Sequence, residues 1–250
     1  MRLKNKVAIV TGAGAGIGRG IAERFGREGA SVVVAEINPA NGATAERCIR
    51  EGGGDALFVE TDVSNEAQVK AMAQKALDRF GRIDVLCNNA GILLIHEEAR
   101  AHELSNEAWD RTMAVNLRGY WLCSKYVIPA MLRQGGGSII HVASPTGIFG
   151  FTKLTAYSTS KGGVVGLMRA MAADYAPDKI RVNSIHPGLI LTPMLGAVTR
   201  EDLQGLIDAT PLKRGAEPEE VGWCAVFLAS DEASFVTGSE LVVDGGYTAQ

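Results

Sequence analysis

The sequence predicts an α/β protein whose core is a parallel sheet of about seven strands with helices on both faces. Short apolar runs alternate with longer helical patterns through the whole chain of 250 residues, as in repeated β–α units. Most of these runs are apolar throughout, which is typical of parallel strands covered on both faces. The predicted strands are residues 7–10, 31–35, 55–60, 85–87, 138–142, 181–185 and 240–243.

Helical patterns occupy the segments between these strands: Ile17, Ile21 and Phe25, for example, recur at a spacing of four residues on one helix face. No linker, low-complexity stretch or internal repeat divides the chain, so we expect a single domain over residues 1–250. From about residue 188 to 213 the rhythm of strands and helices breaks. An irregular excursion after the carboxyl end of a strand is placed to cover a site.

Composition and charge exclude several classes of function. The formal net charge is −3 and Lys and Arg are scattered, so no nucleic-acid or membrane partner is indicated. The amino terminus lacks the apolar core of a signal peptide, and no apolar stretch approaches the ~18 residues of a membrane-spanning helix. The four cysteines are far apart and lack metal-ligand spacing, which predicts a reduced compartment and no metal site. We expect a soluble cytoplasmic protein.

The first predicted strand runs into a glycine-rich turn, Thr11-Gly12-Ala13-Gly14-Ala15-Gly16-Ile17-Gly18. Such a turn lets the backbone approach a pyrophosphate and directs a helix amino terminus at its charge. The common G-x-G-x-x-G pattern is not met, because the glycines follow T-G-x-x-x-G-x-G instead. The turn's place after the first strand nevertheless predicts a doubly wound, dinucleotide-binding (Rossmann) fold.

Glu36 ends the second predicted strand, 18 residues after Gly18. A carboxylate near this position can accept hydrogen bonds from the adenosine ribose of NAD, and it would repel the 2′-phosphate of NADP. Neither Ile37 nor Asn38 supplies a positive charge. The sequence therefore favours NAD as the cofactor.

Tyr157 and Lys161 lie four residues apart, so a helix would place both side chains on one face. An ammonium close to a phenol favours the phenolate, and we expect Lys161 to lower the pKa of Tyr157. A Tyr with a lowered pKa is a competent general acid/base. An ordinary exposed helix contact has the same spacing, so the pair alone leaves both interpretations open.

Further polar and turn-forming residues follow the predicted strands, at the sheet edge where ligands bind in open α/β proteins. Each alone fits an ordinary turn or cap. They are Asp62-Val63, the run from Asn88 to Gly91, Ser144 and Pro187-Gly188, with Asn116 in the helical pattern before Ser144.

In their order and spacing, these motifs resemble the short-chain dehydrogenase/reductase family. The resemblance rests on the glycine turn, Asn-Asn-Ala-Gly, Asn116, Ser144, Tyr157-x-x-x-Lys161 and Pro-Gly, and it continues through residues 214–221 and 236–246. It covers essentially the whole chain, with no departure at a catalytic position.

The resemblance implies a role for each catalytic residue. Tyr157 would exchange a proton with the substrate oxygen, and Lys161 would lower its pKa and hold the nicotinamide ribose. Ser144 would position the substrate oxygen, and Asn116 would hold a water that links Lys161 to solvent. Such an enzyme transfers hydride between a nicotinamide and a CH–OH carbon.

The resemblance also implies the cofactor contacts. The pyrophosphate would meet the glycine turn, Glu36 would take the adenosine ribose, and two residues after the sixth strand would meet the nicotinamide carboxamide and a nearby phosphate. Asp62 and Val63, after the third strand, would flank the adenine, and Asn89, after the fourth, would line the same trough. In full, the predicted cofactor residues are Gly12, Gly16, Ile17, Gly18, Glu36, Asp62, Val63, Asn89, Tyr157, Lys161, Ile190 and Thr192.

The substrate side is predicted to be largely apolar, with residues 93–96, 145–154 and 189–195 as candidates. His186, before Pro187, is interpreted as structural. Members of the family commonly form tetramers through two long helices, which here would span about residues 105–133 and 157–175. The expected partners are thus a small alcohol or ketone and further copies of the chain.

The leading hypothesis is an NAD-dependent oxidoreductase of a secondary alcohol, sugar or ketone. One alternative is an NADPH-dependent 3-oxoacyl-carrier-protein reductase, which Glu36 and the absence of a nearby basic residue disfavour. A second alternative is a non-catalytic nucleotide-binding sensor, which the intact set of Asn116, Ser144, Tyr157 and Lys161 disfavours.

Overall fold

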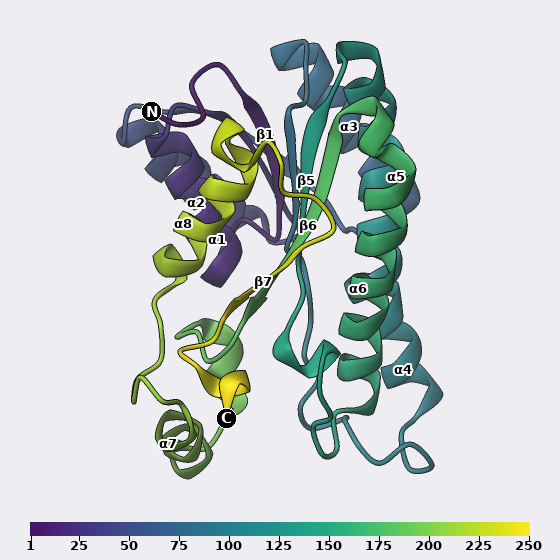
Figure 1. Cartoon of the computed structure of the whole chain (residues 1–250), viewed down its shortest axis with the longest axis vertical. Helices are drawn as coiled ribbons and strands as arrows, with labels where there is room; N and C mark the ends of the chain where they lie inside the picture. Colours follow the sequence, from purple (N-terminus) through teal and green to yellow (C-terminus); the bar gives the residue numbers. More distant parts are fainter.

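Seven parallel strands form the central sheet in the order β3-β2-β1-β4-β5-β6-β7, which confirms the predicted fold class (Figure 1). The computed structural model describes the backbone of residues 1–250 and the side chains of residues 1–196 and 198–250. Every predicted strand overlaps an observed one. The strands are β1 (Val7–Thr11), β2 (Ser31–Glu36), β3 (Asp55–Glu60), β4 (Val85–Asn88), β5 (Gly137–Val142), β6 (Ile180–Pro187) and β7 (Glu240–Val243).

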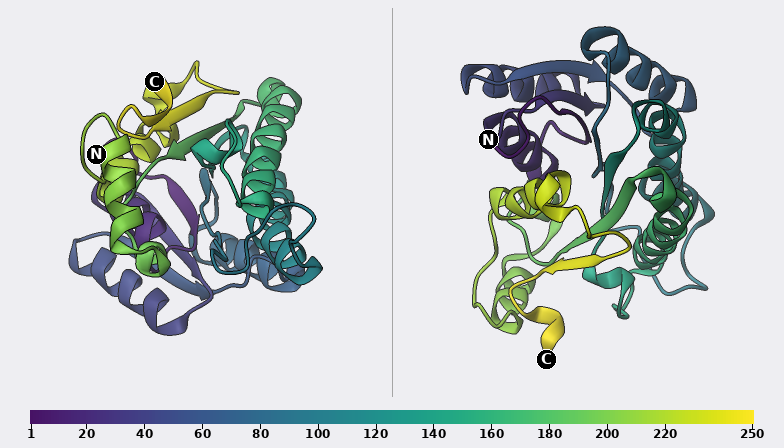
Figure 2. Two further views of the ribbon diagram at one scale, coloured as in Figure 1. Left: turned by 90° about the horizontal axis from the view of Figure 1, so that it is seen from below. Right: turned by 45° about the horizontal axis from the view of Figure 1, so that its top comes forward.

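Helices cover both faces of the sheet (Figures 1 and 2). On one face lie α1 (Gly16–Arg27), α2 (Pro39–Glu51) and α8 (Pro218–Ala229). On the other lie α3 (Glu66–Phe80), α5 (Gly119–Gln134) and α6 (Thr155–Tyr175). The shorter α4 (Asn106–Met113) and α7 (Arg200–Ala209) lie near the carboxyl ends of the strands.

Neighbouring residues of one strand enter opposite halves of the core. Ala8 and Val10 of β1 pack in the cluster with α1, α2 and α8, while Ile9 between them packs in the cluster with α3, α5 and α6. All three side chains are fully buried. This two-sided burial is the physical reason that the strands read as continuous apolar runs.

All strands run parallel, but the side of β1 on which successive strands are added changes between β3 and β4. From β1 the chain builds outward to β2 and β3, and it then returns to the other side of β1 with β4. The loops that leave β1 and β4 therefore diverge, and open α/β sheets bind ligands at such a point. The glycine turn and Asn89 lie at these two strand ends.

Two segments differ from the prediction. The long helix expected at about residues 105–133 is α4 and α5 joined by one turn of π-helix at Ala114–Arg118. A π turn inside a helix is rare and frequent at functional sites. The excursion after β6 is also more regular than expected, since it contains α7. No residue of α7 is fully buried, so its sequence lacks the continuous apolar stripe that indicates a helix.

Among residues 1–196 and 198–250, no helix has both the length and the apolar composition needed to cross a membrane. Within the same residues, no cluster of three or more His, Cys, Asp or Glu side chains is arranged to hold a metal ion.

Candidate active site

The turn between β1 and α1 requires glycine where other backbone segments come close. A Cβ on Gly18 would lie 2.2 Å from the Gly12 carbonyl oxygen and 2.3 Å from Asn89 Nδ2, nearer than real atoms approach. Gly12 also has a φ of +63°, a left-handed value that other residues rarely adopt. The turn is therefore folded tightly against the end of β4.

The amino terminus of α1 leaves donors available beside this turn. Its first hydrogen bond runs from the Arg19 N–H to the Ala15 carbonyl at 3.2 Å, so the three preceding N–H groups have no partner within the helix. These groups belong to Gly16, Ile17 and Gly18, and no acidic residue occupies the first helical turn. Free N–H groups at the positive end of a helix suit a pyrophosphate, so the residues present fit a dinucleotide.

Asn89 braces the glycine turn from the end of β4. Its side-chain amide donates to the carbonyls of Thr11 at 3.0 Å and Gly12 at 3.3 Å. Its backbone N–H donates to Thr11 Oγ1 at 2.9 Å. The residue predicted to line the cofactor trough thus also holds the shape of the turn.

Glu36 at the end of β2 lies against the same turn. The side chain is 8% exposed, and its two carboxylate oxygens accept hydrogen bonds from the N–H groups of Gly14 at 2.9 Å and Asn38 at 3.0 Å. Each oxygen keeps a further lone pair for another donor, such as a ribose hydroxyl. The negative charge therefore stands next to the loop predicted to bind the pyrophosphate.

The predicted adenine contacts follow β3 in two different environments. Asp62 Oδ1 accepts hydrogen bonds from the N–H and the hydroxyl of Ser64 at 2.9 and 2.7 Å, which shapes the turn before α3. Val63 is only 5% exposed and packs in the core cluster with α3 and α5. The side chain of Val63 therefore has little free surface for a ligand.

The two predicted contacts after β6 also differ from each other. Ile190 is 4% exposed, and its backbone forms an isolated bridge with Ala216. Thr192 approaches the glycine turn, since a Cβ on Gly16 would lie 3.2 Å from Thr192 Cγ2. The fold therefore brings Thr192, from the distant excursion, beside the first turn of α1.

Lys161 is buried beneath the end of β5, although it carries a charge. Its side chain is 4% exposed, and Nζ donates to the Val142 carbonyl at 2.9 Å and to Tyr120 Oη at 3.4 Å. Tyr157 lies one turn earlier on α6, with its ring centroid 5.7 Å from Lys161 Nζ. The predicted placement of both side chains on one helix is confirmed.

The electrostatics of this pair differ from the prediction. Burial lowers the pKa of Lys161 to about 8. Burial also raises the pKa of Tyr157 to about 12, and the Ser144 hydroxyl opposes that rise. The prediction that Lys161 lowers the pKa of Tyr157 is therefore wrong for the chain by itself, because loss of solvation is the larger effect.

Ser144 follows β5 and presents its hydroxyl as a donor. Ser144 Oγ accepts hydrogen bonds from the Thr146 N–H at 3.2 Å and the Thr146 hydroxyl at 3.1 Å. Two incoming bonds occupy both lone pairs, so the proton of Ser144 remains free to be donated. The Ser144 carbonyl lies 3.0 Å from Nδ1 of the fully buried His186, which is consistent with a structural role for that histidine.

Asn116 lies within the π turn and is fully buried. Its Oδ1 accepts from the Ile92 N–H at 2.8 Å, and its Nδ2 donates to the Ile92 carbonyl at 2.9 Å and to Ser160 Oγ at 3.2 Å. A Cβ on Gly91 would lie 3.4 Å from Asn116 Oδ1 and 3.6 Å from Lys161 Nζ. The fold thus brings Asn116 and Lys161 to the same point.

The segments predicted to form the substrate side carry large apolar side chains at the surface. Ile148, Leu191 and Met194 are 50%, 40% and 46% exposed. Phe149, Phe151 and Tyr247 form an aromatic cluster with ring centroids 5.7, 5.9 and 6.4 Å apart. Tyr247 was not predicted here, because it lies near the carboxyl terminus and no local pattern ties it to the segment after β5.

Tyr120 is a further neighbour of the site that the sequence did not reveal, and Thr146 lies in the predicted substrate segment 145–154 but has no predicted role of its own. Tyr120 Oη donates to the Val142 carbonyl at 2.9 Å, the same oxygen that Lys161 contacts. Thr146 orients Ser144 as described above. The only available sequence signal is that each lies within four residues of a predicted site residue.

Comparisons with known proteins extend over nearly the whole chain. The profile of the enoyl-(acyl carrier protein) reductase family matches residues 12–248. Cyclopentanol dehydrogenase of Comamonas sp. (strain NCIMB 9872) is 42% identical over 250 residues, which cover 99% of each chain. Cyclohexanol dehydrogenase of Acinetobacter sp. (strain SE19) is 40% identical over 249 residues, covering 100% of this chain and 97% of that one. A 3-oxoacyl-[acyl-carrier-protein] reductase of Thermotoga maritima is 38% identical and covers 98% of this chain and 99% of its own.

Solved structures agree in fold over the same extent. Levodione reductase superimposes with a TM-score of 0.94 at 34% identity, covering 99% of each chain. A 7α-hydroxysteroid dehydrogenase complexed with NADH and 7-oxo glycochenodeoxycholic acid gives a TM-score of 0.93 at 36% identity, covering 98% of this chain and 95% of that one. A short-chain type dehydrogenase/reductase from Mycobacterium marinum gives 0.93 at 36% identity, covering 99% and 97%.

Proposed function

Because the chain belongs to the short-chain dehydrogenase/reductase family, we propose that it is an NAD-dependent dehydrogenase of alicyclic secondary alcohols. The observation that carries the proposal is the convergence of Tyr157, Lys161, Ser144 and Asn116 at the sheet edge that also holds the glycine turn. The relatives that oxidise cyclopentanol and cyclohexanol support the class of substrate. The exposed apolar side chains near the site suit a hydrocarbon ring better than a sugar.

The catalytic work of the chain is to move one proton. Tyr157 takes the hydroxyl proton as the alcohol becomes a ketone, and it returns a proton to the ketone oxygen in the reverse direction. Ser144 donates a hydrogen bond to that oxygen and holds it within reach of the phenol. A bound NAD would supply the acceptor for the hydride of the carbinol carbon, and the positive charge of its oxidised ring would favour the phenolate of Tyr157.

Lys161 has two roles in the proposal. Its ammonium would hold the nicotinamide ribose. Lys161 would also release a proton to a water held at Asn116 and take up the proton that Tyr157 gives up. The pKa of about 8 suits this second role, because a group that titrates near neutral pH both accepts and releases protons.

Glu36 supports the choice of NAD. Its buried carboxylate stands beside the glycine turn and would face the 2′-phosphate of NADP, and two like charges at close range repel each other. The same argument disfavours the NADPH-dependent 3-oxoacyl-carrier-protein reductase, although a relative with that activity is of similar identity. A nucleotide-binding sensor would not need the buried Lys161 or the donor geometry of Ser144.

Initial rates with cyclopentanol, cyclohexanol and a 3-oxoacyl thioester, each with the NAD and NADP couples, test the proposal. We expect turnover of the cyclic alcohols and a preference for NAD of at least about tenfold. Glu36→Gln should weaken this preference, whereas Glu60→Gln, an exposed change at the matching register position on β3, should not. A preference for NADP, or for the thioester over both alcohols, would overturn the proposal.

We also propose that residues 1–250 form one domain that acts as a cytoplasmic homotetramer. The tetramer would be assembled through the outer faces of α4, α5 and α6. The exposed Trp109 and Trp121, 37% and 45% accessible, support an apolar contact on α4 and α5. The four free cysteines suit a reducing compartment. Light scattering after size exclusion would measure the assembly, and a monomer at micromolar concentration would refute it.

A further inference from the structure

The helix that carries Tyr157 and Lys161 has no cap of its own. Its N-cap residue, Leu154, is apolar, makes no side-chain cap bond and has φ and ψ of −125° and 49°, away from the extended geometry of a usual cap. The first N–H groups of any helix need an acceptor from outside the helix. At the start of α6 that acceptor must come from another part of the chain.

Glu98, in the loop between β4 and α4, supplies both acceptors. Its Oε1 accepts from the backbone N–H of Tyr157 at 2.7 Å, and its Oε2 accepts from the N–H of Ala156 at 3.1 Å. The hydroxyl of Thr155 donates to the neighbouring Ala99 carbonyl at 2.8 Å. Three consecutive residues of α6 are therefore bound to two consecutive residues of a loop almost 60 positions earlier.

The chemistry of these contacts favours a strong attachment. Hydrogen bonds from N–H groups to a carboxylate are charge-assisted and stronger than those to neutral acceptors. The negative charge also lies at the positive end of the dipole of α6. The side chain is partly buried, which limits competition from water. The attachment point is the backbone of the acid/base residue itself.

The loop that carries Glu98 also contains the predicted substrate segment at residues 93–96. At its start, Ile92 is bound on both backbone groups by Asn116. The loop is thus held at one end by Asn116 and at the other by the first turn of α6. Both attachments involve residues placed in the proton-transfer machinery.

We propose that Glu98 is a positioning residue, which fixes the backbone of Tyr157 and ties the substrate-side loop to the catalytic helix. The inference rests on the proposed function only for its effect on turnover. Catalytic rates depend steeply on the placement of the reacting groups, and an error of about 1 Å can cost a hundredfold. Loss of the carboxylate should therefore lower kcat while the remote glycine turn still binds NAD.

Glu98→Ala and Glu98→Gln test this proposal, with Glu97→Gln as the matched control. Glu97 is the adjacent carboxylate, 44% exposed, and its partner Arg111 lies 3.3 Å away at the surface. For Glu98→Ala we expect kcat to fall about tenfold to a hundredfold, with the Kd of NAD within about twofold of the parent. Glu98→Gln should give a smaller fall, because its one amide oxygen keeps one of the two bonds. Glu97→Gln should change neither constant.

Hydrogen exchange at the amides of Ala156 and Tyr157 tests the contact without any substrate. We expect the amide that loses its acceptor to exchange faster in Glu98→Gln, which keeps a polar side chain and should stay folded, and both amides to be unchanged in Glu97→Gln. Unaltered exchange in Glu98→Gln, or a kcat within about twofold of the parent in Glu98→Ala, would overturn the proposal. If the parent protein itself turns over no alcohol, the proposed function fails while the exchange result still decides the role of Glu98.

Discussion

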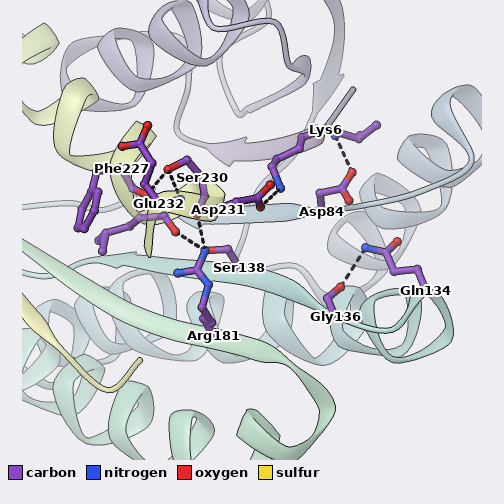
Figure 3. A network of polar contacts seen from close by, with 12 residues as sticks. Lys6, Asp84, Gln134, Gly136, Ser138, Arg181, Phe227, Ser230, Asp231 and Glu232 are labelled. Atoms are coloured by element: carbon purple, nitrogen blue, oxygen red, sulfur yellow. Dashed lines mark hydrogen bonds and ion pairs between the residues drawn. The ribbon is translucent and has the colours of Figure 1, made fainter. Parts of the chain in front are cut away.

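At the amino edge of the sheet Lys6 and Arg82 form ion pairs with Asp231 and Asp84, whereas at the carboxyl edge Lys161 is buried with a carbonyl and a hydroxyl as its hydrogen-bond partners. In the amino-edge network (Figure 3), Lys6 Nζ lies 2.8 Å from Asp231. Arg181 in the same network donates to the carbonyls of Leu228 at 2.7 Å and Ser230 at 3.1 Å. At the other edge, among the side chains that the structure describes, Lys161 makes no ion pair.

Hydrogen bonds within ion pairs set the pKa shifts of two groups at the amino edge, whereas burial lowers the pKa of Arg181 there and of Lys161 at the carboxyl edge. At the amino edge, the hydrogen bond from Lys6 lowers the pKa of Asp231, and the hydrogen bond to Asp84 raises the pKa of Arg82. Both shifts keep these groups ionised across the physiological range. At the carboxyl edge, burial brings the pKa of Lys161 down to about 8, near neutral pH. Ion pairing therefore keeps groups charged at the amino edge, whereas burial brings the pKa of Lys161 near neutral at the carboxyl edge, as its proposed role in proton transfer requires.

Of the variants proposed here, Tyr157→Phe, at the carboxyl edge, should cause the largest loss of kcat. Removal of the acid/base typically costs about 10²- to 10⁴-fold in turnover, and we expect a loss of kcat in that range with NAD binding nearly unchanged. Tyr120→Phe is the matched control, because it removes a second phenol 3.4 Å from the same ammonium and should cost far less. Steady-state rates and fluorescence titration with NAD measure both. Full activity in Tyr157→Phe would show that Tyr157 is not the acid/base.

Arg181→Met, at the amino edge, should lower the stability of the protein and leave its catalytic rate unchanged. The change removes two charge-assisted hydrogen bonds to carbonyls after α8, although the Leu228 carbonyl keeps the Ser138 hydroxyl at 2.9 Å, and it should lower the free energy of unfolding by about 1–3 kcal/mol. The kcat per folded molecule should stay the same. Lys179→Met removes a charge from the exposed rim of the same region and should cost less. Urea unfolding and steady-state rates measure the two properties. A large loss of kcat in Arg181→Met would contradict the view that the amino-edge network contributes only to stability.

Near neutral pH, His141→Gln should have the smallest effect of the three, and its main consequence should appear in acid. His141 is fully buried beside Asn88, and burial lowers its pKa from 6.5 to about 3. Between these pH values His141 is protonated in the unfolded chain and neutral in the folded chain. The free energy of unfolding therefore falls as the pH falls, by at most about 1.4 kcal/mol per pH unit. The variant should lose this part of the slope.

Burial also lowers the pKa of His186, so a shallower acid dependence should remain in His141→Gln. Unfolding free energies of the parent and the variant at several pH values below neutrality would measure the difference between the two slopes. Identical slopes in the two proteins would show that His141 is already protonated in the folded state at mildly acidic pH.

Local pattern predicted those parts of the site that depend on neighbours in sequence. The glycine turn is legible because residues 12–18 must form a tight loop between a strand and a helix. Tyr157 and Lys161 are legible because a helix alone brings residues four positions apart together. The role of Glu98 could not be predicted, since its partners lie on another element and nothing in its local sequence indicates them.

The prediction for the pKa of Tyr157 shows the same boundary in energetic terms. Spacing indicated an ammonium near the phenol, and this is confirmed at 5.7 Å from the ring centroid. Spacing did not indicate that Lys161 is buried, that Tyr157 is partly buried, or that Lys161 donates to the Val142 carbonyl. Burial depends on how β5, α5 and α6 pack together, and for Tyr157 it outweighs the hydrogen bond with Ser144, which lowers the pKa.

By itself, the sequence determined the parallel sheet, the position of the dinucleotide turn and the pair Tyr157 and Lys161 on one helix. These features follow from periodicity and from backbone constraints within a few residues. Only the tertiary structure decided how deeply the pair is buried, which loop caps α6, and that Tyr247 joins Phe149 and Phe151. Such features depend on which distant loops meet at the carboxyl edge, and local periodicity carries no information about those meetings.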